Sequence, residues 1–338
     1  MPMNIQERVS LKDKTTLHSG GQARYFANVG STEELAEAIQ FSEAQGIPFF
    51  ILGGGSNVLF SDAGFNGLVI HMGIQGIEWS KYGAKVCAGE NWDNFVKESI
   101  RHEMWGVENL SGIPGTVGAA PIQNIGAYGV EVKERIMEVE VFNTNTKQNE
   151  ILRNADCQFS YRDSLFKKPE GKRLVVTSVT FLLSKIPKPN LGYKDIQAYF
   201  KADSLEPTLQ NIRSAVLDIR SGKFPDLQHM ATAGSFFKNP IISEEHYKNL
   251  SILYPDIPSY AVSDKMVKVP LAWILDKVCQ LKGFRNGNVW LHDSQPLVLV
   301  TNRKAASDEI KSFSEEVKLC VYEKTNIQIE NEVVFVEN

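Results

Sequence analysis

Two short glycine-rich stretches limit what this chain can fold into more than any other feature of its sequence. In the first, Gly53–Gly55 follow an apolar segment at 48–52 and precede Ser56 and Asn57. Glycine adopts positive φ without strain, and successive backbone N–H groups in such a turn can hold anionic oxygens. No Gly-Lys-Ser/Thr follows, and the apolar residues 58–60 predict a strand, which excludes a Walker A loop and the glycine motif of Rossmann domains. A plain tight turn is the alternative.

The second glycine-rich stretch, GIPGTVGAAPIQNIGAYG, covers residues 112–129. Its first three glycines recur at every third position from Gly112 to Gly118, and two prolines fix φ nearby. This pattern predicts neither a helix nor a central strand, and the stretch has too few charges for a solvated linker. We expect a loop that lies against a flat ring system and a diphosphate, with a structural Ω-loop as the alternative.

The length of the chain predicts its number of domains, and its charge balance excludes two kinds of partner. The chain has 338 residues, which at about 150 residues per domain predicts two domains. Lysine and arginine together number 36, aspartate and glutamate 40, and no basic run is longer than a pair. Nucleic acids and anionic membranes both require a cationic face, so neither is expected as a partner.

Cysteine and histidine usage and the N-terminus indicate the cellular setting. The four cysteines form no Cys-x-x-Cys pair and the six histidines have no metal-ligand spacing, so no metal site is predicted. The N-terminal residues are polar, and no window approaches the ~18 apolar residues of a membrane span. We therefore expect a cytoplasmic protein.

Hydrophobic periodicity and turn residues predict a mixture of helices and strands, with an α+β organisation. Ser31 and Glu34 have the spacing of a capping box, and Asn91 can cap a second helix. The expected helices cover 31–46, 91–103, 209–221, 271–282 and 308–324, and the expected strands cover 48–52, 67–72, 137–142, 150–153, 173–184 and 327–336.

Six segments together resemble the UDP-N-acetylenolpyruvoylglucosamine reductase family. They are LGGGSNVL (52–59), SGIPGTVGAAPIQNIGAYG (111–129), CQFSYRDSLFK (157–167), AGSFFKNP (233–240), LAWILDKVCQLKG (271–283) and ENEVVF (330–335). The resemblance runs in order along essentially the whole chain. It implies an α+β fold: an FAD-binding fold of the vanillyl-alcohol-oxidase/PCMH type in two subdomains, plus a C-terminal α+β substrate-binding domain.

The expected domains follow from this resemblance and from the prolines between 187 and 207. We expect FAD-binding subdomain 1 at 1–75, joined by the terminal strand 326–338, then subdomain 2 at 76–205 and the substrate-binding domain at 206–325. The segments LGYKD (191–195) and IPSYAVSDKMVK (257–268) are similar to those of the loop-bearing, type I class of the family.

The resemblance also implies the activity, which is the NADPH-dependent, FAD-containing reduction of UDP-N-acetylenolpyruvoylglucosamine to UDP-N-acetylmuramate in peptidoglycan precursor synthesis. Hydride passes from NADPH to the flavin and then to the β-carbon of the enolpyruvyl ether, and a proton reaches the α-carbon. The implied cofactor is non-covalent FAD, and the implied partners are this substrate and NADPH. We expect a bacterial, cytoplasmic monomer.

This reaction builds negative charge on the substrate carboxylate, which calls for a fixed cation and a proton donor. Arg162, in SYRDS, matches the family's arginine; a salt bridge to Asp163 is the structural alternative. Glu332, in ENEVVF, matches the second catalytic residue, with Glu330 as its competitor. A carboxylate beside a developing anion must be protonated or paired with the arginine.

The proton donor implied by the resemblance is Ser235, in AGSFFKNP, with Lys238 or a water molecule as a possible relay. From the sequence alone, a serine after a glycine is more often a turn residue or a helix cap. Two segments depart from the family pattern: TTLHSGG stands at 15–21 in place of Asn-Thr-Phe-Gly, and Val334 stands where an arginine is common.

The remaining implied contacts divide between cofactor and substrate. The residues expected to bind FAD are Gly53, Gly54, Gly55, Ser56, Asn57, Gly112, Ile113, Pro114, Gly115, Thr116, Gly118, Ala119, Ala120, Gln123 and Asn124. The residues expected to bind the nucleotide sugar are Tyr193, Lys223, Asn239, Tyr260, Lys268 and Gln295. Two alternative functions are an oxidase of the same superfamily and a nucleotide-sugar-binding regulator without turnover.

Overall fold

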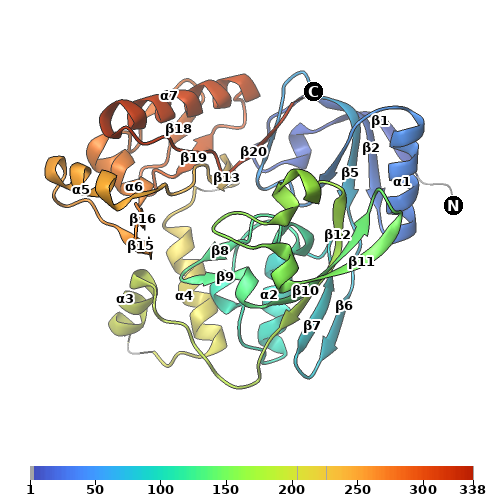
Figure 1. Cartoon of the computed structure of the whole chain (residues 1–338), viewed down its shortest axis with the longest axis horizontal. Coiled ribbons are helices and arrows are strands. Elements are labelled where there is room, and N and C mark those ends of the chain that lie inside the picture. The colour runs from blue at the N-terminus through green and yellow to red at the C-terminus, as the bar shows by residue number, and fades with distance from the viewer. Residues whose placement is uncertain (1–3, 204, 226, 338) are drawn as a thin grey trace. The chain divides into compact units, whose positions relative to one another are not determined.

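A computed structural model describes residues 4–203, 205–225 and 227–337 (Figure 1). The chain divides into two compact units. Unit 1 comprises Met1–Val9, Ala23–Gly55 and Asn66–Ser221, and unit 2 comprises Ser10–Gln22, Ser56–Phe65 and Gly222–Asn338. Each unit is therefore assembled from segments that are far apart in the sequence.

The first sheet has four strands in the order β1-β2-β5-β3, which are Ile5–Ser10, Gln22–Val29, Phe65–Met72 and Phe49–Leu52. Strands β3 and β5 are parallel, with Phe49 opposite Leu68. Helix α1, Thr32–Ala44, connects β2 to β3, and the Ser31 side chain accepts a hydrogen bond from the Glu34 N–H as expected for an N-cap. The helix and both strands predicted in this region are confirmed.

The second sheet of unit 1 is antiparallel, with strand order β11-β10-β12-β7-β6. The strands are Gln148–Arg153, Ile136–Asn143, Leu174–Leu182, Gly83–Cys87 and Ile77–Ser80. The predicted hairpin at 137–142 and 150–153 is thus confirmed as β10–β11, which forms one edge of this sheet (Figure 1).

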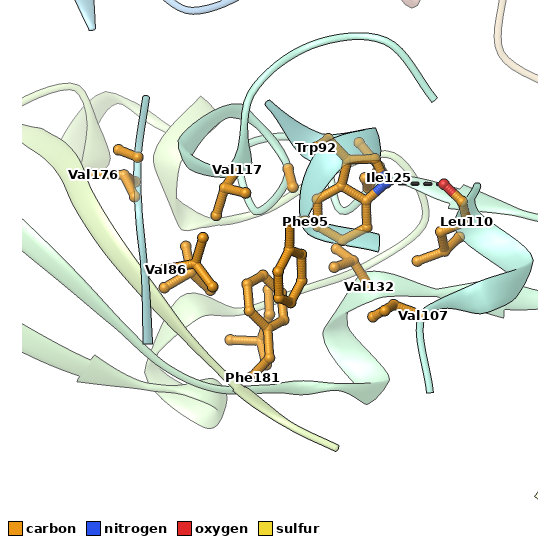
Figure 2. Packing of buried hydrophobic residues seen from close by; sticks show 14 of the residues in the cluster. Val86, Trp92, Phe95, Val107, Leu110, Val117, Ile125, Val132, Val176 and Phe181 are labelled. Carbon is orange, nitrogen blue, oxygen red and sulfur yellow. Dashed lines mark hydrogen bonds between the residues drawn. The ribbon is translucent and has the colours of Figure 1, made fainter. Parts of the chain in front are cut away.

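The hydrophobic core of unit 1 is built around helix α2, Trp92–Arg101. The rings of Phe95 and Phe181 stack with centroids 4.8 Å apart, and the Trp92 indole N–H donates to the Leu110 carbonyl at 2.9 Å (Figure 2). Aromatic contacts of this kind add specific geometry to apolar burial. They fix the start of α2, from which the second glycine stretch is held.

Helix α4, Leu209–Ser221, also packs into the core of unit 1 through Leu209, Ile212 and Val216. The structural division falls at Ser221/Gly222 and differs from the boundary expected near 206. The reason is that the apolar side of α4 is covered by this core, whereas the prolines at 187–207 lie in connections around α3, Lys194–Asp203.

The short elements of unit 1 lie mostly in the connections. They are β8 Gly126–Ala127, β9 Val130–Glu131, and the 3-10 helices η2 Glu108–Leu110, η3 Val117–Ala119, η4 Val132–Glu134, η5 Asn154–Cys157, η6 Leu165–Lys167 and η7 Pro169–Gly171.

Unit 2 contains an antiparallel sheet in the order β13-β19-β18-β17 and a smaller sheet in the order β14-β16-β15. Helix α6, Leu271–Trp273, continues into the π-helix η8, Ile274–Val278, so the single helix predicted at 271–282 is shorter and irregular. The other elements are β13 Ala231–Ser235, β14 Ile241–Ser243, α5 Glu244–Leu253, β15 Tyr260–Ser263, β16 Met266–Lys268, β17 Arg285–Asn286, β18 Val289–Leu291, β19 Val298–Thr301, α7 Ser307–Thr325 and the 3-10 helix η1 Lys12–Lys14.

The last strand, β20, Val334–Val336, pairs in parallel with β4, Val58–Phe60. Both strands belong to unit 2, whose core also contains Leu17 and Leu59. The end of the chain is therefore held by a segment that directly follows the first glycine stretch.

In the part of the chain that the structure describes, no helix has the length and apolar character needed to cross a membrane. No group of three or more histidine, cysteine, aspartate or glutamate side chains is placed to bind a metal ion among these same residues.

Candidate functional site

The two glycine stretches meet within unit 1. A Cβ atom on Gly54 would lie 2.8 Å from the Gly115 Cα, and one on Gly53 would lie 2.7 Å from the Thr116 Oγ1. Real Cβ atoms do not approach backbone atoms this closely, so the contact between the two backbones requires glycine at position 54. A plain tight turn at 53–55 would not require this contact.

The second stretch is held on the connection between β7 and α2. The N–H of Gly118 donates to Ala88 O at 2.9 Å, and that of Val117 donates to Glu90 O at 2.8 Å. A Cβ on Gly118 would lie 2.5 Å from the Ala88 Cβ, so glycine is needed here as well. The loop is consequently ordered by its neighbours although it contains little regular structure.

Several polar groups at this contact remain available for a ligand. The Thr116 hydroxyl is buried, and it makes no hydrogen bond to the residues that the structure describes. The N–H groups of Gly54 and Gly115 likewise donate to no backbone carbonyl within 4–203, 205–225 and 227–337. An unpaired buried hydroxyl is rare in folded proteins, and this hydroxyl and the two N–H groups fit the oxygens of a diphosphate.

Asn124, near the end of the second stretch, uses its side chain to organise the surrounding chain. Its Nδ2 donates to Glu131 at 3.1 Å and to Ser160 O at 2.9 Å, and its Oδ1 accepts from the Lys133 N–H at 3.1 Å. The residue has a left-handed backbone, with φ of 45°. Asn124 thereby connects the glycine stretch to the turn that carries Arg162.

Arg162 lies in a tight turn in which Ser160 and Asp163 exchange backbone hydrogen bonds. Its φ of 53° is left-handed, a conformation that non-glycine residues adopt at a cost of about 1–3 kcal/mol and that is concentrated at functional sites. The guanidinium donates to Gly126 O at 2.9 Å and lies 5.5 Å from the centre of the Tyr161 ring. The second glycine stretch therefore helps to orient the arginine.

Ser235 and Glu332 are brought to neighbouring segments of unit 2. Ser235 ends β13 after a register shift, and Gly234 before it has a φ of 79°. The next residue, Phe236, accepts a hydrogen bond from the Glu332 N–H at 2.8 Å. Glu332 is 9% exposed, and its carbonyl accepts from the Asn57 Nδ2 at 3.1 Å.

Glu330 and Lys238 form a separate pair. The Lys238 ammonium lies 2.7 Å from the Glu330 carboxylate, whose side chain is 74% exposed. The Lys238 N–H also donates to Glu330 O at 3.0 Å. The two candidate glutamates therefore have different surroundings, because Glu330 pairs with a lysine near solvent whereas Glu332 is buried.

Comparison with known proteins decides the family. Residues 23–150 match a family model described as FAD binding domain, and residues 226–336 match one described as UDP-N-acetylenolpyruvoylglucosamine reductase, C-terminal domain. A reductase of this name from Chromobacterium violaceum is 38% identical over 339 residues, which cover 98% of this chain and 99% of the relative. One from Neisseria gonorrhoeae is 39% identical over 335 residues, which cover 97% of this chain and 96% of the relative.

The chain belongs to the UDP-N-acetylenolpyruvoylglucosamine reductase family. The crystal structure of the reductase from Thermus caldophilus matches with a TM-score of 0.71 at 25% identity, over 98% of this chain and 99% of that one. The fold of 6-hydroxy-D-nicotine oxidase from Arthrobacter nicotinovorans matches with a TM-score of 0.52 at 14% identity, over 96% of this chain and 86% of that one. The predicted α+β fold, with an FAD-binding domain and a C-terminal domain, is confirmed.

As a member of this reductase family, the chain is an FAD-dependent oxidoreductase of peptidoglycan precursor synthesis, with NADPH as co-substrate. It reduces UDP-N-acetylenolpyruvoylglucosamine to UDP-N-acetylmuramate, as the sequence predicted. The match of 226–336 to the reductase C-terminal domain distinguishes this function from that of an oxidase with the same flavin domain. The glycine contact and the available polar groups of unit 1 fit the diphosphate of FAD.

Five of the predicted substrate residues lie in unit 2. Tyr260 is 61% exposed on β15, where it is directly opposite Lys268 of β16. The Asn239 side chain accepts from the Leu271 N–H at 2.9 Å, and the Gln295 Oε1 is buried without a hydrogen-bond partner among the described residues. Lys223 directly follows Gly222, whose carbonyl accepts from the Ser294 hydroxyl at 2.8 Å.

The sixth predicted substrate residue, Tyr193, lies in unit 1. Its ring meets the Tyr128 ring edge-on, with centroids 5.3 Å apart and planes at 82°. Tyr193 is 39% exposed, so part of the ring remains open to solvent. Its contact with Tyr128 connects it to the end of the second glycine stretch.

The two departures from the family pattern lie in well-packed or strand-paired segments of unit 2. In the divergent segment 15–21, Leu17 is buried in the core, and a Cβ on Gly20 would lie 2.9 Å from the Phe60 Cβ. Val334 is in β20, where its N–H donates to Asn57 O at 3.0 Å and its side chain is 40% exposed. Both positions are used for packing and strand pairing.

Four polar residues around the second glycine stretch are not among the site residues that the sequence predicts. They are Asp93, Tyr128, Arg213 and Arg220. The sequence contains little signal for them, because an acidic residue in a first helical turn and arginines along a helix are common features of solvated helices. Their importance follows from contacts between segments that are distant in the sequence.

Proposed function

We propose that Arg162, Ser235 and Glu332 carry the charge and proton chemistry of this reductase. FAD held at the contact between Gly54 and Gly115 would supply the hydride chemistry between NADPH and the enolpyruvyl β-carbon. The Arg162 guanidinium binds the substrate carboxylate and balances the negative charge that develops there, because it stays charged and presents a rigid set of donors. Its left-handed turn and its bond to Gly126 support this role, since both restrict its orientation.

In this proposal Ser235 donates the proton to the α-carbon and Glu332 supports the developing enediolate. The observation that supports the proposal is the hydrogen bond from the Glu332 N–H to Phe236 O, because it joins the backbone of the buried Glu332 to the residue that follows Ser235. The ion pair between Lys238 and Glu330 gives both of those residues another role. We therefore assign the proton relay to water.

For the nucleotide sugar we propose the six predicted residues, which supply cations for the diphosphate and aromatic or amide groups for the sugar and base. They are Tyr193, Lys223, Asn239, Tyr260, Lys268 and Gln295. The buried Oε1 of Gln295 supports this assignment, because an unsatisfied buried acceptor is costly unless a ligand donates to it. Tyr260 opposite Lys268 adds an exposed ring beside a cation.

The test is the Ser235→Ala variant, followed in two half-reactions by flavin absorbance. We expect NADPH to reduce the flavin at the wild-type rate, because this step needs no proton from Ser235. Reoxidation by the enolpyruvyl substrate is expected to slow by about 10²- to 10⁴-fold, the usual contribution of a general acid. Ser251→Ala, on the exposed side of α5, is the control and should change neither step. Equal losses in both half-reactions would show that Ser235 is structural.

We also propose that the protein acts as a monomer in the bacterial cytoplasm. Light scattering of the purified FAD-loaded protein tests whether it is a monomer, since a stable dimer would give twice the mass of one chain.

A further inference from the structure

The second glycine stretch begins at a charged contact between two helices of unit 1. The Gly112 N–H donates to the Asp93 Oδ1 at 2.5 Å. Arg213, on α4, donates to both oxygens of the same carboxylate at 2.7 Å. One aspartate on α2 therefore holds the first residue of the stretch and a residue 120 positions away.

The Asp93 carboxylate is charged at neutral pH. Burial by itself would raise its pKa, but the hydrogen bonds from Arg213 and from the Gly112 N–H outweigh burial and hold the pKa below its usual value. Paired fork-shaped contacts between arginine and a carboxylate fix geometry as well as charge. The Asp93–Arg213 pair thus restrains the position of the Gly112 backbone.

Helix α4 also packs directly on the start of the stretch. Gly112 has a φ of 71°, and a Cβ there would lie 2.9 Å from Leu217 Cδ2 and 3.1 Å from the Arg220 Nε. Arg213, Leu217 and Arg220 are four and three residues apart, so they share one face of α4. This face of α4 covers Gly112.

The same face of α4 reaches the far end of the stretch. The Arg220 guanidinium is hydrogen-bonded to the Tyr128 hydroxyl. Burial raises the pKa of Tyr128 to about 12, so this hydroxyl remains protonated at neutral pH. Helix α4 consequently holds the stretch 112–129 at both ends, at Gly112 through Asp93 and Arg213 and at Tyr128 through Arg220.

We propose that Asp93 and Arg213 are positioning residues for FAD binding, which act through the glycine stretch. A glycine-rich segment loses more conformational entropy than any other when it is ordered. Fixing its ends before the ligand arrives removes this loss from the binding step and increases affinity. The proposal rests on the FAD site described above, because it takes the second glycine stretch to be part of that site.

The experiment measures FAD binding to the apoprotein of Asp93→Ala and Arg213→Lys by flavin fluorescence, well below the thermal transition. We expect the Kd for FAD to rise about tenfold or more in Asp93→Ala, which equals about 1.4 kcal/mol. Arg213→Lys keeps the charge but loses the fork, so it should give a smaller rise. The Tm of each apoprotein is recorded in parallel.

The matched control is Arg101→Ala, which breaks the exposed ion pair with Glu98 on the same helix and should leave the Kd unchanged. A lower apoprotein Tm in Asp93→Ala with a Kd within twofold of the wild type would overturn the inference, because the pair would then be purely structural. If Asp93→Ala does not fold, an unchanged Kd in Arg213→Lys overturns it equally. Failure of the wild-type apoprotein to bind FAD would overturn the FAD site itself and this inference with it.

Discussion

At the scale of single residues, the absence of a side chain at Gly54 allows the two glycine stretches to meet. The sequence predicts that both stretches bind a ligand through their backbone, but it does not show that they touch. The structure adds the contact between Gly54 and the Gly115 Cα. It also shows that the nearby Thr116 hydroxyl is buried without a partner among the described residues.

Gly54→Ala should weaken FAD binding without abolishing the fold. The added Cβ would lie 2.8 Å from the Gly115 Cα, so one loop must move. Overpacking of this kind usually costs about 1–3 kcal/mol, which corresponds to a rise in Kd of about five- to 140-fold if the whole cost falls on the bound state. Titration of the apoprotein with FAD measures this. In the control, Gly30→Ala, the new Cβ would lie 3.6 Å from the Glu34 Oε2, an ordinary contact, so an equal effect there would contradict the explanation.

At the scale of elements, the helix caps were predictable and the irregular turns were not. Ser31 and Asn91 accept hydrogen bonds from N–H groups three residues later, as their spacing indicates. The helix expected at 271–282 instead becomes a π-helix at Ile274–Val278, in which the Cys279 N–H donates to Ile274 O. Apolar periodicity cannot distinguish a regular α-helix from a π-helix over these residues, because both bury nearly the same side chains.

Ser31→Ala should destabilise unit 1 by about 1 kcal/mol, because the first turn of α1 loses the acceptor for the Glu34 N–H. The midpoint of urea unfolding measures the change. Ser251→Ala is again a suitable control, since its hydroxyl donates within α5 at an exposed position. Equal midpoints for Ser31→Ala and the wild type would show that Ser31 does not cap the helix in solution.

The contact between α2 and α4 should also appear in the pH dependence of stability. Because the folded state lowers the pKa of Asp93, the stability that this carboxylate contributes is complete above its unfolded pKa of about 3.9. This stability is lost as the pH falls through the lower, folded-state pKa. The difference in unfolding free energy between the wild type and Asp93→Asn should therefore shrink as the pH is lowered from 6 toward 2, roughly through this window. Denaturant unfolding at several pH values measures it, and a difference that stays constant would argue against the charged pair.

At the scale of the whole molecule, neither unit corresponds to a continuous piece of chain. Unit 2 combines Ser10–Gln22 and Ser56–Phe65 with the C-terminal segment that begins at Gly222. Leu17 and Leu59 are 1% and 4% exposed in its core, and β4 pairs with β20. The family model for the C-terminal domain covers 226–336, which is one of the three segments of this unit.

A fragment that contains only residues 222–338 should therefore be unstable. It lacks the strand that pairs with β20, and it loses Leu17 and Leu59, each of which contributes about 1.5–3 kcal/mol when fully buried. Thermal unfolding followed by circular dichroism should show a weak, non-cooperative transition, whereas the full chain unfolds cooperatively. A sharp transition in the fragment near the Tm of the full chain would contradict this assembly.

The sequence by itself determined the helix starts, several of the strands, the position of the two glycine-rich stretches and, through six motifs, the family. These features depend on interactions between residues that are near one another in the chain, or on motifs that are read directly. Only the tertiary structure decided that Gly54 contacts Gly115, that α4 belongs to unit 1, and that Asp93 pairs with Arg213 over 120 positions. Such contacts depend on how the whole core packs, and local periodicity contains no information about the distance between two segments that far apart.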